Sequence, residues 1–235
     1  PMPELIGRLQ VDFAKLKECG RIFAFPHAVL SQIPPDRASV RAGRGRLPLS
    51  VSRPPHILVD VGRRFAVYSD RFIAVPARQI GVAGSEGTQN LLKALSIILS
   101  SRFCTYHQFF ATPQWGVSYS LAALDAFREM PIPLADITDE EVCDLARMRD
   151  ELAAEFGSNA PVEANLRAID ERVYDLFGLA REERVIVDDF VCLHMQMVQG
   201  KVPARLVAPP SDRTMLSYLT TLKAMDGYSR EMDRN

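Results

Sequence analysis

The stretch from Leu91 to Leu134 constrains the fold of this chain more than any other part of the sequence. Leucine and isoleucine recur at helical spacing in its first part, so one face of a helix over residues 88–103 is apolar enough to be buried. The pattern breaks at Pro113 and Gly116, and the prolines of the segment 130–133, Met-Pro-Ile-Pro, favour an extended exit. The sequence therefore predicts a buried central helix, an aromatic loop and an extended segment.

Strand-like segments precede this helix. Residues 56–62 are rich in β-branched side chains and lie between a Pro-Pro pair and a glycine, which is typical of a buried strand. Residues 65–68 and 72–75 are predicted to form a hairpin. The glycine-rich segment 81–88 lacks the lysine of a GxxxxGK[ST] nucleotide-binding loop. We expect the N-terminus of the central helix there, capped by Ser85 or Thr88, although its amides could also receive a phosphate.

The chain after Leu134 has the pattern of acidic, amphipathic helices. Thr138 and Glu141 form a capping box, and apolar spacing predicts helices that begin near residues 138, 161 and 181. We therefore predict an α+β fold, with a small mixed β-sheet and a central helix over residues 21–134 and an α-helical domain over 135–200. Residues 1–20 are expected to form a helical lead-in, and residues 201–235 a C-terminal helical extension with a helix over about 212–225.

The two halves of the chain differ in charge. Residues 1–133 carry 16 Lys and Arg against 9 Asp and Glu, a net charge of +7, whereas residues 134–235 carry 12 against 20, a net charge of −8. Nine arginines and only two acidic residues, Asp60 and Asp70, lie between positions 37 and 78. Arginine is suited to bidentate contacts with phosphate groups and guanine edges. The basic half is therefore a candidate nucleic-acid surface.

Three segments carry a family resemblance. The central helix ends in Ser100-Ser101-Arg102, then come aromatic residues, a glycine-containing loop and the Met-Pro-Ile-Pro exit. This order resembles the TaqI-like target-recognition domain of adenine-specific DNA methyltransferases, in which an Asn-Ser-Lys-like triplet and a Leu-Pro-Ile-Pro exit are typical. The segment 53–59 resembles the Lys/Arg-Pro-x-Ile-Leu strand that opens that domain. Residues 169–179, with Glu182 and Glu183, resemble the Ile-Asp-x-x-Val-Tyr-x-Leu-Tyr-Gly-Leu tail that follows it.

The resemblance covers about residues 53–190 and implies sequence-specific recognition of duplex DNA by the specificity portion of an N6-adenine DNA methyltransferase of a restriction-modification system. The family's catalytic Asn/Asp/Ser-Pro-Pro-aromatic tetrapeptide, which holds a flipped adenine, is absent from all three Pro-Pro pairs of this sequence. A glycine-rich turn for S-adenosylmethionine is absent too. We therefore expect no catalysis and no cofactor site in this chain, and a catalytic methyltransferase domain that works with it in cis or in trans.

The expected DNA contacts combine backbone and base recognition. Arginines are suited to phosphates, and Gln114 is suited to the N6 and N7 edge of adenine. Trp115 beside it is expected either to close the core where the central helix meets the exit or to read bases, and we favour the structural role. The predicted DNA-binding residues are Arg41, Arg44, Arg46, Arg53, Arg63, Arg64, Gln114 and Ser118.

Two other interpretations remain open at this point. The chain could be a non-catalytic protein-interaction module with acidic docking helices, or a small enzyme with an unrecognised site. Cys104 and His107 lie three residues apart, but no third group orients them, so a structural pair is favoured over a thiol nucleophile. The four cysteines are scattered, which predicts neither disulfides nor a metal site. No membrane span or signal peptide is recognised, so we expect a cytoplasmic protein.

Overall fold

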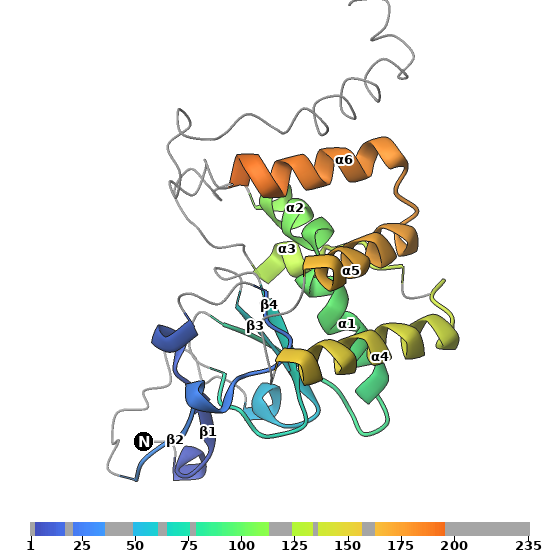
Figure 1. Ribbon diagram of the computed structural model, residues 1–235. Coiled ribbons are helices and arrows are strands. Elements are labelled where there is room, and N and C mark those ends of the chain that lie inside the picture. The colour runs from blue at the N-terminus through green and yellow to red at the C-terminus, as the bar shows by residue number, and fades with distance from the viewer. Residues whose placement is uncertain are drawn as a thin grey trace, which may run out of the picture.

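Two antiparallel sheets and six α-helices make up the part of the chain that the computed structural model describes (Figure 1). That part comprises residues 3–16, 21–35, 49–60, 65–75, 79–112, 124–133, 136–156 and 163–195. The α+β class predicted from the sequence is confirmed. The predicted helix over about residues 212–225 lies outside the described residues.

The larger sheet has the strand order β4-β3-β5. Its central strand β3 (His56–Asp60) pairs antiparallel with β4 (Phe65–Ser69) and with β5 (Ile80–Ala83). All residues of β3 and β4 are buried, in agreement with the apolar, β-branched pattern of residues 56–62. The strand prediction for this segment is confirmed, and β5 occupies part of the segment that was expected to be only a loop before the helix.

The prediction that residues 65–68 and 72–75 form a hairpin is wrong. Strand β4 pairs over its whole length with β3, because β3 offers five consecutive buried partners. Ile73 instead forms an isolated parallel bridge with Leu9, and the Ala74 N–H donates to the Leu9 carbonyl at 2.8 Å. Segment 72–75 is therefore joined to the N-terminal part of the chain.

The outer edge of β4 is covered by side chains from two helices. The Ser100 Oγ accepts the Ala66 N–H at 3.1 Å, and Arg149 donates from Nη2 to the Tyr68 carbonyl at 2.9 Å. The same Arg149 nitrogen donates to the Phe23 carbonyl at 3.1 Å. Backbone groups that would otherwise be unpaired at the sheet edge are thus satisfied within the chain.

The helical lead-in expected over residues 1–20 is not formed in residues 3–16. Two 3-10 turns, η1 (Pro3–Leu5) and η2 (Phe13–Leu16), flank strand β1 (Leu9–Val11), which pairs with β2 (Leu30–Gln32) just after the turn η3 (His27–Val29). Gly7 has a φ of 74°, which ends the first turn and turns the chain into β1. The strand pairing outweighs a helical spacing of leucines that the sequence alone favoured.

The central helix is confirmed as α1 (Gln89–Ser100), but it ends earlier than predicted. The chain bends at Ser101, whose Oγ accepts the Cys104 N–H at 3.1 Å and so caps α2 (Arg102–Ala111). At the other end, Thr88 is the N-cap of α1, yet its hydroxyl donates to the Ser85 carbonyl and caps no helix amide. The two helices form a bent rod through the middle of the molecule (Figure 1).

Four further helices complete the described chain: α3 (Leu124–Arg128), α4 (Asp139–Phe156), α5 (Glu163–Leu176) and α6 (Arg181–Asp189), the last continued by a π-helical turn, η5 (Phe190–His194). The predicted capping box of α4 is confirmed, since the Thr138 N–H donates to the Glu141 carboxylate and the Glu141 N–H to the Thr138 hydroxyl. Residues 139–156 and 163–195 contain no strand.

A single hydrophobic cluster crosses the predicted domain boundary at residues 134 and 135. It joins Ile57 and Val59 of the sheet to Ile97 of α1, Leu145 of α4 and Val173 of α5. A second, smaller cluster lies between the large sheet and the N-terminal segment and includes Val11, Leu58 and Phe65. The packing therefore does not separate residues 21–134 and 135–200 into two cores.

Candidate nucleic-acid interface

Most of the residues predicted to bind DNA lie outside the described residues. This holds for Arg41, Arg44, Arg46, Arg63, Arg64, Gln114 and Ser118, and also for Trp115. Arg53 is described and is exposed, just before β3. Of the predicted set, the structure therefore describes Arg53 alone.

Ion pairing separates the described basic residues into two groups. Ten of the described lysines and arginines lie within 4.0 Å of a carboxylate oxygen: Lys15, Arg21, Lys93, Arg102, Arg128, Arg147, Arg149, Arg167, Arg172 and Arg184. Within the described chain Arg8, Arg53, Arg71 and Arg181 have no such pair and all four are exposed. Arg181 begins α6, while the other three belong to the sheet region.

His56 holds the backbone positions of Arg53 and Arg71 close to each other. Its ring is fully buried, with Nδ1 at 2.9 Å from the Val51 carbonyl and Nε2 at 3.1 Å from the Arg71 carbonyl. Burial lowers the pKa of His56, and the hydrogen bonds to the two carbonyl oxygens oppose that effect. Arg53 follows Val51 by two residues, so one imidazole ring links the two segments that bear these arginines.

Arg8 is held by an aromatic ring. Its guanidinium carbon lies 4.9 Å from the centre of the Phe72 ring. The parallel bridge between Leu9 and Ile73 sets the two residues opposite each other. Nothing in the linear sequence signalled this pair, because residues 8 and 72 meet only through the tertiary bridge.

The described segments that flank residues 36–48 lead to Arg8 on one side and to Arg53 on the other. Before the stretch, the Ile33 N–H donates to the Arg8 carbonyl at 2.9 Å, and the described chain stops at Pro35. After it, the chain resumes at Leu49 in the 3-10 turn η4 (Leu49–Ser52), which leads directly into Arg53. The described chain therefore stops two residues after Ile33, whose N–H contacts Arg8, and resumes four residues before Arg53.

The connection that contains Arg63 and Arg64 joins the other end of the hairpin. Strand β3 ends at Asp60 and β4 begins at Phe65, whereas Arg53 and Arg71 flank the opposite end of the same two strands. Five residues of strand separate the ends by roughly 17 Å. Asp60 at that far end is buried and accepts a hydrogen bond from Gln79 at 3.3 Å.

The other conspicuous charged cluster is a buried network between helices. Asp170, 1% exposed, accepts Arg21 at 2.7 and 3.0 Å and the Arg102 N–H at 2.9 Å. Arg102 also donates to Asp188, which accepts the Tyr174 hydroxyl at 2.7 Å. Burial raises the pKa of Tyr174, and the hydrogen bond to Asp188 raises it further. The network joins the N-terminal segment to α2, α5 and α6. Because the charges of its two arginines and two aspartates balance, it leaves no free charge for a ligand.

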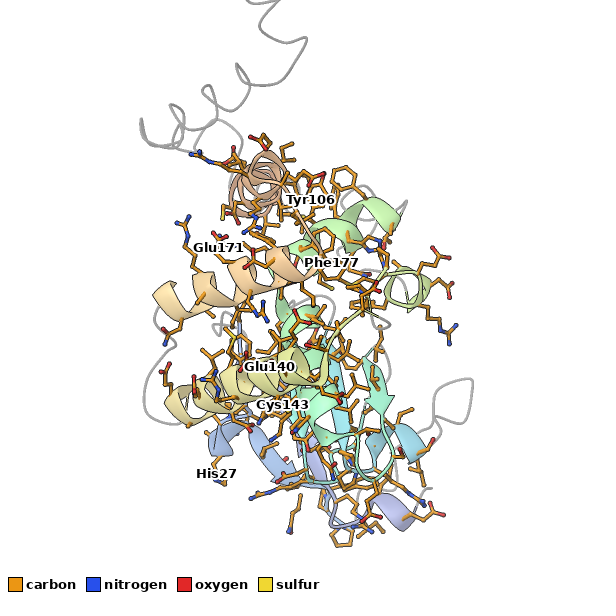
Figure 2. The ribbon with its side chains drawn as sticks, turned by 90° about the vertical axis from the view of Figure 1, so that its right-hand side faces the viewer. His27, Tyr106, Glu140, Cys143, Glu171 and Phe177 are labelled. Atoms are coloured by element: carbon orange, nitrogen blue, oxygen red, sulfur yellow. The ribbon has the colours of Figure 1, made fainter. Side chains whose placement is uncertain are left out.

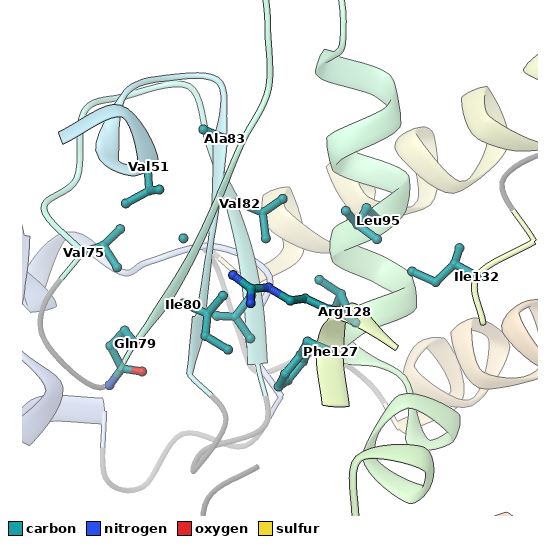
Figure 3. A pocket seen from close by; sticks show the side chains of 13 residues that line it. Val51, Val75, Gln79, Ile80, Val82, Ala83, Leu95, Phe127, Arg128 and Ile132 are labelled. Atoms are coloured by element: carbon teal, nitrogen blue, oxygen red, sulfur yellow. The ribbon is translucent and has the colours of Figure 1, made fainter. Parts of the chain in front are cut away.

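An open apolar groove of about 640 Å³ lies between β5, α1 and α3 (Figure 3). Val82 and Leu95 line its walls, and Phe127 and Ile132 close one side. Arg128 reaches from α3 towards β5 at the mouth of the groove, although its guanidinium also pairs with Asp125 at 3.3 Å. The lining carries no cluster of polar groups that would orient a substrate.

An aromatic cluster lies at the end of α2 and the start of η5. The rings of Phe109 and Phe110 each approach the Phe190 ring, at 4.8 and 5.1 Å between centres, and Tyr106 contacts both Phe110 and Phe190. Phe110 is 60% exposed. Figure 2 shows Tyr106 in the helical part of the molecule and His27 at the end that carries the small sheet.

The Cys104 and His107 pair does not have the properties of a catalytic thiol and its base. Cys104 is buried in the core, and burial raises the pKa of its thiol to about 12, which disfavours a thiolate nucleophile. Burial also lowers the pKa of His107. The described side chains include no group of three or more His, Cys, Asp or Glu that could hold a metal ion. No helix in the described ranges is both long enough and apolar enough to cross a bilayer.

Comparison of the chain with family models, curated proteins and solved structures finds no match. The resemblance to the methyltransferase recognition domain therefore rests on the sequence segments quoted above.

Proposed function

We propose that this chain is a duplex DNA recognition module, the specificity portion of an N6-adenine DNA methyltransferase. The observation that carries the proposal is that Arg8, Arg53 and Arg71, which have no carboxylate partner within the described chain, lie on segments joined by the bridge between Leu9 and Ile73 and by the His56 ring. The described arginines of the helical part, apart from Arg181, pair with carboxylates. Guanidinium groups without a carboxylate partner can neutralise the phosphates of a nucleic-acid backbone. A module of this kind would act in the cytoplasm.

As the family resemblance implies, this chain would recognise DNA and a separate domain would carry out methyl transfer. S-adenosylmethionine and the adenine-holding tetrapeptide would belong to a catalytic domain that works with this chain in cis or in trans. The predicted DNA-binding residues Arg41, Arg44, Arg46, Arg53, Arg63 and Arg64 would contact phosphates, whereas Gln114 and Ser118 would face bases.

A protein-interaction module is the second candidate, and the aromatic cluster of Tyr106, Phe109, Phe110 and Phe190 favours it. A protein surface that exposes a ring such as Phe110 in contact with other rings is suited to a protein partner. The acidic helices themselves favour it less, because Arg147 pairs with Asp144 and Glu151, and Arg184 with Glu171 and Asp175. Much of that acidity is therefore compensated within the chain.

Fluorescence anisotropy with a random-sequence duplex at 50 and 200 mM salt tests the first candidate. Binding that weakens steeply with salt is expected, because phosphate contacts release counterions. A double variant Arg41→Ala/Arg44→Ala should bind all sequences more weakly and show a shallower salt dependence. Absence of binding at 50 mM salt would contradict the proposal and favour the protein-interaction module.

A further inference from the structure

The described residues point to a phosphate contact that the sequence did not assign. Arg8 lies in the segment predicted to be a helical lead-in, yet the bridge between Leu9 and Ile73 brings it to the segment 71–75 that follows β4. Arg53 and Arg71 are the other described arginines of the sheet region that have no ion pair. The position of Arg8 therefore follows from the fold and from no local motif.

The geometry leaves the donor groups of Arg8 available. Its guanidinium carbon lies 4.9 Å from the centre of the Phe72 ring, so the cation is attracted by the ring face. An aromatic ring under a guanidinium restricts its orientation and occupies no N–H donor, in contrast to a carboxylate. The Arg8 side chain is exposed, and no described carboxylate lies within ion-pair distance. An oriented, unpaired fork of this kind is suited to an anion with several oxygens.

The charges around Arg8 decide which anion is meant. Arg53 and Arg71 lie on segments that the His56 ring links, and Arg8 packs on Phe72, the residue that follows Arg71. Three unpaired cations on adjoining segments fit a ligand whose negative charges repeat, whereas a single small anion would need only one of them. The sugar-phosphate backbone of duplex DNA has such a repeat.

We infer that Arg8, oriented by Phe72, and Arg71 contact phosphates of the DNA backbone and extend the interface onto the N-terminal segment. This inference rests on the proposed function. Phe72 is a positioning residue, because it acts through Arg8. The contact contributes affinity for all sequences and no base preference.

Four single variants test the inference, measured by anisotropy with two duplexes, one A·T-rich and one G·C-rich. Arg8→Gln and Arg71→Gln should each lower affinity for both duplexes. Each lost contact changes the salt exponent by about 0.9, so the loss should be roughly 3- to 4-fold larger at 50 mM than at 200 mM salt. Phe72→Leu keeps the charge of Arg8, so it should lower affinity by about 2- to 5-fold with an unchanged salt exponent.

Arg181→Gln is the matched control. Arg181 is also exposed and without an ion pair among the described residues, but it begins α6, at the end of the molecule opposite β1 and β2 (Figure 1). It should leave DNA binding unchanged. Far-UV circular dichroism and melting temperature verify the fold of each variant.

The outcomes separate this inference from the proposed function. If the unaltered chain binds DNA with strong salt dependence but Arg8→Gln and Arg71→Gln behave like Arg181→Gln, the inference is overturned and the proposed function stands. A loss confined to one of the two duplexes would overturn the phosphate assignment. No binding by the unaltered chain would overturn both.

Discussion

His56 shows how one buried side chain can make folding stability depend on pH. Its imidazole lies between the carbonyls of Val51 and Arg71, and burial lowers its pKa. The unfolded chain therefore takes up a proton near the ordinary histidine pKa of about 6.5, before the folded chain does. Folding stability from this group is present above pH about 6.5 and is lost as pH falls towards the lowered pKa of the folded state.

We predict that the free energy of unfolding in urea decreases between pH 7.5 and pH 5.5, and that His56→Asn reduces this dependence. The pH dependence that remains in this variant should come from His107, whose pKa is also lowered by burial. His27→Asn serves as a control at an exposed histidine and should keep the whole dependence. A His56→Asn variant with the full pH dependence would show that another group is responsible.

The loss of Asp170 should be strongly destabilising. It is 1% exposed and pairs with Arg21 and with the backbone and side chain of Arg102. Asp170→Ala leaves two partly buried arginines without this carboxylate, and we expect a loss of about 3–5 kcal/mol in the free energy of unfolding.

Asp125→Ala is the matched control for that measurement. Asp125 also pairs with an arginine, Arg128, but both side chains are largely exposed. Its removal should change the free energy of unfolding by less than about 1 kcal/mol. Equal effects of the two substitutions in urea titrations would contradict the structural role assigned to Asp170.

At the scale of elements, the approach of η4 to β5 depends on a glycine. A Cβ added at Gly81 would lie 2.8 Å from the Val51 Cβ and 2.9 Å from the Val51 carbonyl oxygen. The carbonyl belongs to the backbone and also contacts His56, so it cannot move away easily. We expect Gly81→Ala to lower the free energy of unfolding by about 1–3 kcal/mol, as overpacking does. An unchanged denaturation midpoint would show that η4 shifts without cost.

Several elements could be predicted from the sequence because their determinants are local. The leucine spacing of α1, the capping box of α4 and the β-branched run of β3 each lie within a few neighbouring residues. The segment 1–20 has a similar leucine spacing, but β1 forms there through pairing with β2, about 20 residues later. Such non-local pairing leaves no reliable mark on a short window of sequence.

The residues of the candidate site likewise divide into those with local determinants and those that depend on non-local contacts. Arg53 could be chosen from the sequence, because it lies in a basic stretch just before a predicted strand. Arg8 and Arg71 required the bridge between Leu9 and Ile73 and the ring of His56, which join segments about 60 and 15 residues apart. Whether a described arginine has a carboxylate partner also depends on the fold, so the unpaired state of Arg8 and Arg71 could not be predicted from the sequence.

At the scale of the whole molecule, the shared core predicts one cooperative unit. Leu145 of α4 is 1% exposed and belongs to the same hydrophobic cluster as Ile57 and Val59 of β3. Leu145→Ala should lower the free energy of unfolding by about 2–5 kcal/mol and speed hydrogen exchange in β3 and β4 as well as in α4.

Hydrogen-exchange mass spectrometry measures this directly. Leu91→Ala, at a leucine of α1 that is 41% exposed, is the control and should change stability by no more than about 0.5 kcal/mol. Faster exchange confined to peptides of α4 would show that the helical part unfolds on its own, as two separate domains would.

The covered edge of β4 limits where this chain can be shortened. Arg149 of α4 satisfies the Tyr68 carbonyl, so a fragment that stops at residue 134 would retain the sheet but lose part of its cover. An uncovered edge of a strand as apolar as β4 is a template for pairing between molecules. Fragments made for crystallisation or domain exchange should therefore extend at least through residue 156, since shorter ones are expected to aggregate.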